Sequence, residues 1–165
     1  KSLIKNASNN DNIFIKKLSK KQKINLFEDI AYVGQHFVVF PGTVYENIFM
    51  NRPMTISESY LIEMLTSLNL IKNPSDTQSF LNHIVNENGS NFSGGELQRI
   101  CVLRGLVQNK PILCLDEPTA SISSLASQDL LKFLKEHWIK NKNKRVIIAT
   151  HDKSIYKYAD VIIYS

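Results

Sequence analysis

Ile112-Leu113-Cys114-Leu115-Asp116-Glu117-Pro118 is an apolar run that ends in two adjacent carboxylates. Such a run predicts a buried strand, and the acids after it would lie at the carboxyl end of a parallel sheet, where α/β folds bind ligands. Phosphoryl-transfer sites need a carboxylate that holds Mg2+ and a group that orients the attacking water. We therefore expect Asp116 to serve the metal and Glu117 the water. An acidic loop after a core strand is the alternative that this motif alone leaves open.

Strands and helices alternate on both sides of this motif. Further strands are predicted at residues 13–15, 30–33, 145–149 and 161–164, because each segment is short, apolar and rich in branched or aromatic side chains. Helices are predicted over residues 57–70, 79–85, 95–107 and 124–138, with Thr55 and Glu58 spaced as a capping box before the first. This alternation indicates an α/β fold whose parallel sheet is covered on both faces.

Two glycines stand at the start of the helix predicted at residues 95–107. Gly94 and Gly95 leave backbone N–H groups free to face an anion at the positive end of the helix dipole. Ser93 and Glu96 also have the spacing of a capping box, which would explain those two residues but not the glycines between them. Because glycines cost helix stability, we expect something to approach this backbone closely.

Four short motifs together resemble those of ATP-binding cassette (ABC) ATPases. Phe92-Ser93-Gly94-Gly95-Glu96-Leu97-Gln98-Arg99 resembles the family's signature, and residues 112–118 resemble its Walker B strand. Tyr32-Val33-Gly34-Gln35 resembles the Q-loop, and Ala149-Thr150-His151-Asp152 resembles the loop that carries the switch histidine. Arg104 agrees with the helix that follows the signature. The motifs occur in the family's order and spacing, and the resemblance covers essentially the whole chain.

The resemblance implies a P-loop NTPase-like (RecA-like) α/β fold with an inserted helical subdomain. Residues 1–165 would form a single partial ABC ATPase domain. Residues 1–40 and 107–165 would form its RecA-like core, and residues 41–106 its helical signature subdomain. The implied activity is hydrolysis of ATP in a head-to-tail dimer, in which each ATP lies between the Walker A loop of one subunit and the signature of the other.

The same resemblance assigns a role to each motif residue. Glu117 would polarise the attacking water, and His151 would contact the γ-phosphate. Asp116 and Gln35 would hold the magnesium sphere, and Ser93-Gly94-Gly95 would bind the ATP of the second subunit. The cofactors implied are ATP and Mg2+.

Two further stretches resemble exporters within the family. Phe40-Pro41-Gly42-Thr43-Val44-Tyr45-Glu46-Asn47-Ile48 resembles the segment after the Q-loop, and residues 87–91 resemble the loop that touches the coupling helices of the membrane domain. Glu87 would then transmit motion between the domains; a solvated loop acid is the alternative. The implied partners are a second ABC ATPase domain, identical or different, and transmembrane coupling helices. The implied location is the cytoplasmic face of the cell membrane, within an exporter.

The chain departs from the family pattern in two places. No GxxxxGK(S/T) phosphate loop occurs, although Lys1-Ser2 resembles the end of one. We therefore expect that the chain starts inside a longer polypeptide. Lys1 and Ser2 would then contact ATP, Ser2 would also contact Mg2+, and the isolated chain would bind ATP poorly and be inactive. Ser123 stands where the family's D-loop usually carries an Asp, which implies weaker coupling between the two nucleotide sites or one degenerate site.

Composition fits a globular domain and keeps two rival functions open. The 165 residues are 43% hydrophobic and 21% charged, with a formal charge of +5. Basic clusters at residues 16–23 and 140–145 are expected to be solvated turns, although such clusters can bind nucleic acid or anionic lipid. Cys101 and Cys114 are expected to be reduced thiols. The alternatives are a non-transport ABC ATPase acting on nucleic acid, which the exporter-like stretches disfavour, and a non-catalytic regulatory or remnant domain.

Overall fold

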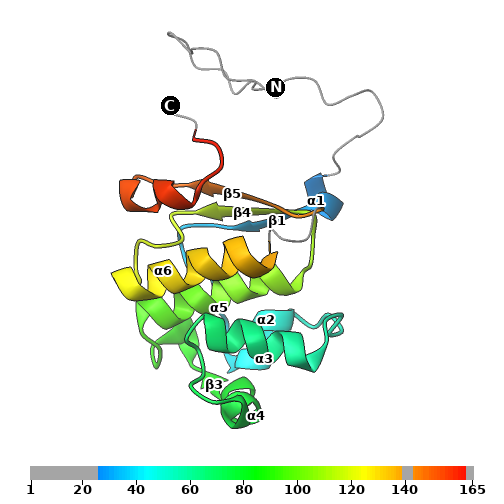
Figure 1. Cartoon of the computed structure of the whole chain (residues 1–165). Coiled ribbons are helices and arrows are strands. Elements are labelled where there is room, and N and C mark those ends of the chain that lie inside the picture. Colours follow the sequence, from blue (N-terminus) through cyan, green and yellow to red (C-terminus); the bar gives the residue numbers. More distant parts are fainter. Residues whose placement is uncertain (1–25, 139–142, 163–165) are drawn as a thin grey trace.

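A three-stranded parallel sheet forms one layer of the computed structural model, which describes residues 26–138 and 143–162 (Figure 1). Its strands are β1 (Ile30–Val33), β4 (Ile112–Asp116) and β5 (Arg145–Ala149), in the spatial order β1-β4-β5. The register places Tyr32 beside Cys114 and Cys114 beside Ile147. The predictions of three strands at these positions and of a parallel sheet are confirmed.

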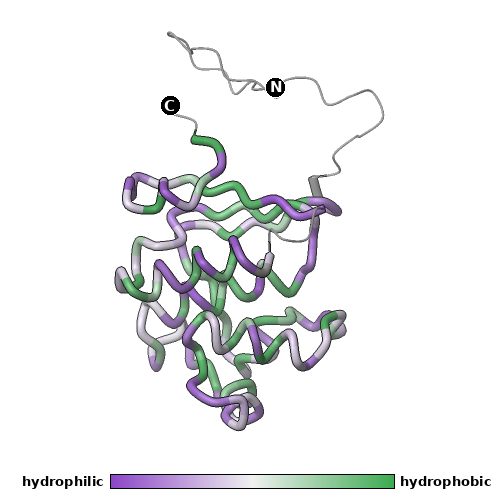
Figure 2. The backbone as a smooth tube through the Cα atoms, in the orientation of Figure 1, coloured by the Kyte–Doolittle hydropathy of each residue, from purple (hydrophilic) through white to green (hydrophobic). Residues whose placement is uncertain are grey.

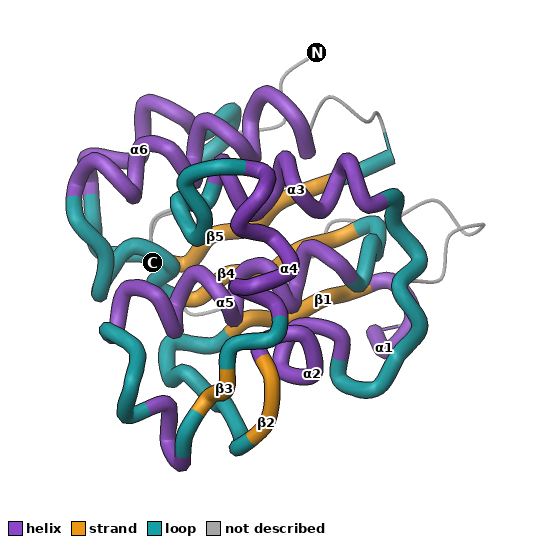
Figure 3. Tube along the Cα trace, turned by 90° about the horizontal axis from the view of Figure 1, so that it is seen from below, coloured by secondary structure: helices purple, strands orange, loops and turns teal. Residues whose placement is uncertain are grey.

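One side of this sheet carries helices α2 (Val44–Phe49), α3 (Glu58–Ser67), α5 (Gly94–Val107) and α6 (Ser124–Phe133). In Figure 3 they lie in front of the strands. Helix α5 packs on β1 and β4, and α2 and α3 pack on α5. On the opposite face Tyr32 is 65% and Ile147 is 57% exposed. Within the described residues, helices therefore cover only one face of the sheet, contrary to the expectation of cover on both.

Shorter elements complete the described chain. They are α1 (Leu26–Asp29), β2 (Gly42–Thr43) paired antiparallel with β3 (Ile84–Val85), α4 (Thr77–Leu81), 3-10 turns at Pro74–Asp76, Glu87–Gly89 and Lys153–Tyr158, and a π-helical segment at Leu134–Trp138. No helix in residues 26–138 or 143–162 has the length and apolarity that crossing a bilayer requires.

Several predicted boundaries are wrong. Helix α3 is capped by Ser57, whose hydroxyl accepts from the Tyr60 N–H, and not by a box of Thr55 and Glu58. The helix predicted at 79–85 ends at Leu81, because residues 84–85 pair with β2 instead. Residues 161–162 lie outside any strand, and residues 163–164 and the strand predicted at 13–15 lie outside the described residues.

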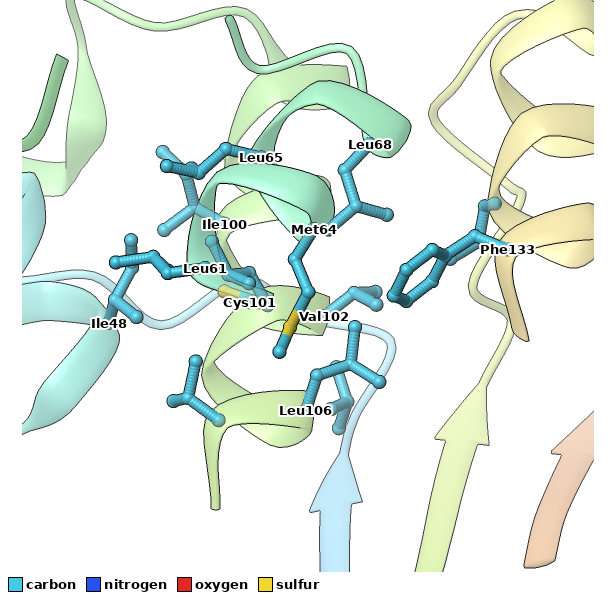
Figure 4. Close-up of a cluster of buried hydrophobic side chains, with 14 of the residues drawn as sticks. Ile48, Leu61, Met64, Leu65, Leu68, Ile100, Cys101, Val102, Leu106 and Phe133 are labelled. Carbon is cyan, nitrogen blue, oxygen red and sulfur yellow. The ribbon is translucent and has the colours of Figure 1, made fainter. Parts of the chain in front are cut away.

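One apolar core joins the sheet to the helices. Ala31 and Leu113 of the sheet belong to the same buried cluster as Met64 of α3, Val102 of α5 and Phe133 of α6. Figure 4 shows the last three gathered between their helices, and Figure 2 shows hydrophobic residues along the strands. The core is continuous across the predicted boundary between residues 1–40 with 107–165 and residues 41–106. The division into these two parts stays a prediction.

The second basic cluster contains a buried lysine. Lys144 is 7% exposed, and its ammonium donates to the carbonyl oxygens of Asn109 and Lys110, just after α5 ends. It also lies 4.6 Å from the centre of the Trp138 ring. Desolvation lowers the pKa of Lys144. For this residue the expectation of a solvated turn is wrong, because its charge closes the end of a helix. The lysines at 16–23, 140 and 142 lie outside the described residues.

Candidate active site

Glu117 is held in a fixed direction at the carboxyl edge of the sheet. Its backbone is left-handed, with φ of 46°, and its N–H donates to Ala149 O over 2.9 Å. Its carboxylate accepts one hydrogen bond from Thr150 Oγ1 at 3.0 Å and another from the His151 N–H at 2.8 Å. The side chain is 18% exposed. Strand β4 thus supplies the acid, and the loop after β5 supplies the donors that orient it.

His151 lies next to this carboxylate and extends into solvent. Its Nε2 is 3.9 Å from Glu117 Oε1, and its side chain is fully exposed. The loop that carries it is ordered locally, since the Asp152 N–H donates to Thr150 Oγ1 and Asp152 Oδ1 accepts from the Ser154 N–H. The bonds from Ser154 lower the pKa of Asp152. An exposed imidazole on an ordered loop can reach a ligand in front of the sheet edge.

Asp116 and Gln35 line one hollow of about 530 Å³ between the end of β1 and α5. The Tyr32 hydroxyl donates to Asp116 Oδ2 at 3.2 Å, and desolvation together with this bond raises the pKa of Tyr32. In the described part of the chain no group of three or more His, Cys, Asp or Glu could hold a metal. Mg2+ commonly keeps several waters and takes one or two carboxylates plus substrate phosphates. Asp116 and Gln35 therefore fit a part of its shell.

Ser93 and Glu96 form the predicted capping box at the start of α5. The Glu96 N–H donates to Ser93 Oγ at 3.2 Å, and the Ser93 N–H donates to Glu96 Oε2 at 2.8 Å. The Ser93 hydroxyl also donates to Glu96 Oε2 at 2.6 Å. These bonds lower the pKa of Glu96. The carboxylate is thus ionised at neutral pH and engages the hydroxyl that the sequence assigned to ATP.

The two signature glycines have different surroundings. A Cβ at Gly94 would meet nothing closer than 4.0 Å, so this side of the backbone is open. A Cβ at Gly95 would lie 3.0 Å from Ser121 O and 3.3 Å from Ile122 Cγ2. The close approach expected at this pair therefore exists at Gly95, where the neighbour is the chain's own turn after Glu117.

Ser123 caps the helix that follows this turn. Its hydroxyl accepts from the Ala126 N–H at 3.3 Å, at the start of α6. Serine is a favoured N-cap residue, so this position has a local structural use. The weaker coupling or degenerate site that Ser123 implied stays a prediction.

The loop that contains Glu87 packs against the segment that follows Gln35. Gly89 is buried with φ of 68°, and a Cβ there would lie 2.7 Å from Leu97 of α5 and 3.0 Å from Val39. Glu87 itself is exposed. The segments after Gln35 and around Glu87 are therefore neighbours, as a transmission role would require, whereas Lys1 and Ser2 lie outside the described residues.

Sequence reasoning missed a buried polar cluster behind the site. Asn47 is 0% exposed, and its Nδ2 donates to Phe40 O and Thr43 O while its Oδ1 accepts from the Phe40 N–H. Arg104 donates from Nε to Asn47 O at 2.7 Å and from its Nη1 to Val38 O at 2.6 Å. Together they tie the segment after Gln35 to α5.

Gln98 was also missed as an individual site residue. It is 4% exposed, and its Nε2 donates to Glu117 O at 2.9 Å while its Oε1 accepts from the Ser121 N–H at 3.1 Å. The sequence did carry a signal, because Gln98 shares a helical face with the buried Cys101 and Val102. A polar residue on the apolar face of a helix predicts a buried hydrogen-bond partner.

Comparison with known families decides what this arrangement is. Residues 2–120 match the sequence profile described as ABC transporter. The chain belongs to the ABC transporter family. The RecA-like α/β fold and the family inferred from the motifs are therefore confirmed. Similarity to a solved ATP-binding cassette, in a dimeric post-hydrolysis state bound to ADP and Pi, agrees: the TM-score is 0.61 and the identity 27%, over 81% of this chain and 56% of that chain.

Other ABC relatives include a flippase, a transporter and a solved exporter. The chain is 31% identical to the ATP-dependent lipid A-core flippase of Haemophilus ducreyi over 84% of this chain and 23% of the relative. It is 31% identical to the mitochondrial Iron-sulfur clusters transporter ATM1 of Debaryomyces hansenii over 88% of this chain and 21% of the relative. It also resembles a bacterial Atm1-family ABC exporter solved with ATP bound, with a TM-score of 0.61 and 27% identity over 74% of this chain and 21% of that one. The chain spans between a fifth and a quarter of the length of these curated relatives.

Proposed function

We propose that this ABC chain is the part of an exporter's ATPase that carries the signature, the Walker B acids and the switch histidine, and that it powers export by ATP binding and hydrolysis. The observation that carries this proposal is the carboxylate of Glu117, fixed by Thr150 and His151 at the sheet edge. The flippase, the transporter and the exporter among the relatives support a role in transport, and the exporter supports its direction.

Glu117 is the group that orients the attacking water. Both donors that hold its carboxylate come from the loop after β5, and the remaining lone pairs of the carboxylate stay available to a water molecule. His151 reaches from the same loop toward the γ-phosphate. Loss of either group would misplace the water or the phosphate that it attacks.

Asp116 and Gln35 are the residues that would hold Mg2+, since both line the hollow beside the sheet edge. When bound, Mg2+ neutralises charge that develops on the phosphates. Tyr32 holds one Asp116 oxygen by a hydrogen bond, so the other oxygen would be the one that contacts the metal. The remaining contacts to nucleotide and metal are assigned to Lys1 and Ser2.

The start of α5 binds the nucleotide of a second ABC ATPase domain. Gly94 is open on its outer side, and the backbone N–H groups of the first turn point along the positive end of the helix dipole. Ser93-Gly94-Gly95 would close on the phosphates held by the partner. The Glu87 loop, together with the segment after Gln35, would pass this closure to transmembrane coupling helices at the cytoplasmic face of the membrane.

A nucleic-acid function gains no support from the described basic cluster, because Lys144 is buried and engaged with carbonyl oxygens. A regulatory or remnant domain would need no ordered catalytic carboxylate. Both alternatives would be favoured again if ATP turnover were absent.

ATP turnover by the longest natural polypeptide that contains this chain tests the proposal. Glu117→Gln should lower turnover about 100-fold or more, because an amide cannot serve as a general base. Glu136→Gln, an exposed change on the π-helical segment, is the matched control and should leave turnover intact. Equal turnover in wild type and Glu117→Gln would refute the role of Glu117.

The isolated 165 residues give a second test. We expect them to bind Mg-ATP weakly in calorimetric titration, because a phosphate-cradling glycine loop is absent from their sequence. Tight binding by these residues alone would contradict this part of the proposal.

A further inference from the structure

Gln98 joins two parts of the chain that the proposed function assigns to two different nucleotides. It lies on α5, one turn after Ser93-Gly94-Gly95, and its amide bonds to the turn that follows β4. Both ends of the amide are used, the donor on Glu117 O and the acceptor on the Ser121 N–H. Gln98 is 4% exposed, so water cannot take the place of either hydrogen-bond partner. Breaking these bonds would leave buried polar groups unsatisfied, which is costly in free energy.

The bond to Glu117 acts on an unusual backbone conformation. A glutamate with φ of 46° lies in the left-handed region, which L-residues other than Asn and Asp rarely adopt. Surrounding contacts must hold it there. The Glu117 N–H is bonded to Ala149, and the Glu117 carbonyl accepts from Gln98 and from the Ala120 N–H at 3.2 Å. Gln98 is thus the contact from α5 that helps fix the direction of the Glu117 carboxylate.

A second contact makes the link stiff. At Gly95 the helix backbone approaches the turn so closely that a Cβ would lie 3.0 Å from Ser121 O. Gln98 is bonded to the N–H of the same Ser121. The first turn of α5 therefore cannot tilt or slide without moving residues 117–121.

We propose that Gln98 is a positioning residue that couples the two ATP sites of the dimer within one chain. The inference rests on the proposed function, in which Ser93-Gly94-Gly95 binds the partner's nucleotide while Glu117 serves the nucleotide of its own chain. Binding of phosphate at the start of α5 would then be transmitted by Gln98 to Glu117. Each chain would hydrolyse its own ATP fastest when its signature is engaged, so turnover would rise cooperatively with ATP concentration.

Gln98→Glu in the natural polypeptide tests this coupling. The carboxylate keeps an acceptor for the Ser121 N–H but loses the donor to Glu117 O. Turnover at saturating ATP should fall about tenfold, and its dependence on ATP concentration should lose cooperativity, while equilibrium ATP binding stays unchanged. Gln128→Glu is the matched control, since it makes the same change at an exposed residue of α6. It should keep both the rate and the cooperativity.

The outcomes separate the inference from the proposed function. No turnover in wild type would overturn both. Cooperative turnover that persists in Gln98→Glu, or wild-type turnover without cooperativity, would overturn the coupling role alone. A thermal-unfolding scan identifies loss of the fold, and if Gln98→Glu is unfolded, Gln98→Met takes its place: an apolar side chain of similar length removes both bonds without burying a charge. The same loss of rate and cooperativity is expected there, and their retention would overturn the proposal.

Discussion

Gly105 of α5 lies directly against Val33 of β1. A Cβ at position 105 would come within 2.7 Å of Val33 Cγ2 and 3.0 Å of Leu113 Cδ1. Both neighbours are buried side chains of the sheet. The missing side chain therefore sets how closely the signature helix approaches the strands that end in the site.

Gly105→Ala should consequently destabilise the fold. Alanine gains about 1 kcal/mol of helix propensity over glycine, but overpacking a filled core costs about 1–3 kcal/mol. The difference is about 0–2 kcal/mol, and we expect a net loss in its upper half, about 1–2 kcal/mol in the free energy of unfolding measured by urea denaturation, because 2.7 Å is shorter than real Cβ contacts. Gly94→Ala is the control, because its Cβ would meet nothing closer than 4.0 Å and no overpacking cost applies. A Gly105→Ala protein as stable as wild type would contradict this packing.

Asn47→Ala should cost more than an ordinary polar deletion. Removing its amide takes a partner from the Phe40 N–H and from the carbonyl oxygens of Phe40 and Thr43, which are partly buried. Buried unsatisfied groups cost about 1–3 kcal/mol each, so a loss of about 2–4 kcal/mol is expected after partial relaxation. Asn82→Ala, an exposed change at the end of α4, should cost less than about 0.5 kcal/mol. Similar losses at both positions in thermal and chemical unfolding would argue against the cluster.

The sheet was predictable because the sequences of two of its strands are apolar enough to indicate burial. Residues 112–116 and 145–149 are short apolar runs, and only a parallel sheet uses such strands between helices. The acids after β4 then fall at the sheet edge by topology alone. Local chemistry was equally clear at Ser93 and Glu96, where a four-residue pattern is sufficient to define the cap.

What the sequence did not predict depends on partners far along the chain. Ile84 is taken from a predicted helix by pairing with Thr43, about forty residues earlier. From the sequence Lys144 is expected to be a surface charge, but in the structure it donates to a carbonyl oxygen just after the end of α5. The side-chain amides of Gln98 and Asn47 bond to backbone atoms. Every residue has such atoms, so the sequence does not show which of them will be the partners. Tertiary hydrogen bonds, more than propensity, decided each of these places.

Glu96→Gln should strengthen nucleotide binding at the start of α5. The Glu96 carboxylate is negative at the end of the helix where a phosphate would bind, and it already accepts from the Ser93 hydroxyl. An amide removes the repulsion, so the ATP concentration for half-maximal dimerisation, measured by light scattering on the natural polypeptide, should fall about three- to tenfold. Glu58→Gln removes an acid from the first turn of α3 and should leave this concentration unchanged. Weaker association in Glu96→Gln would contradict the prediction.

The same substitution should change how stability depends on pH. Bonds from Ser93 lower the pKa of Glu96, so the ionised cap stabilises the fold above the ordinary glutamate pKa. This contribution disappears as the pH falls through the lowered pKa, because the protonated acid binds its donors less well. Wild type should therefore unfold at higher urea than Glu96→Gln at pH 7, and the two should converge on acidification below about pH 4. A gap that stays constant down to low pH would exclude Glu96 as its source.

Thr150→Val should separate the orientation of Glu117 from the binding of ATP. Valine keeps the shape of threonine but removes the hydroxyl that donates to Glu117 Oε2 and accepts from the Asp152 N–H. The carboxylate then keeps only the His151 N–H bond and can rotate, so turnover should fall about 10-fold or more while the equilibrium affinity for ATP holds. Thr77→Val also removes a hydroxyl bond, to Pro74 O at 2.7 Å in the α4 region, and controls for general loss of stability. Single-turnover rates of both variants distinguish these effects. A slowed chemical step in Thr150→Val alone would show that Thr150 orients the carboxylate of Glu117. Equal slowing in both would mean that the hydroxyl acts only through the stability of the fold.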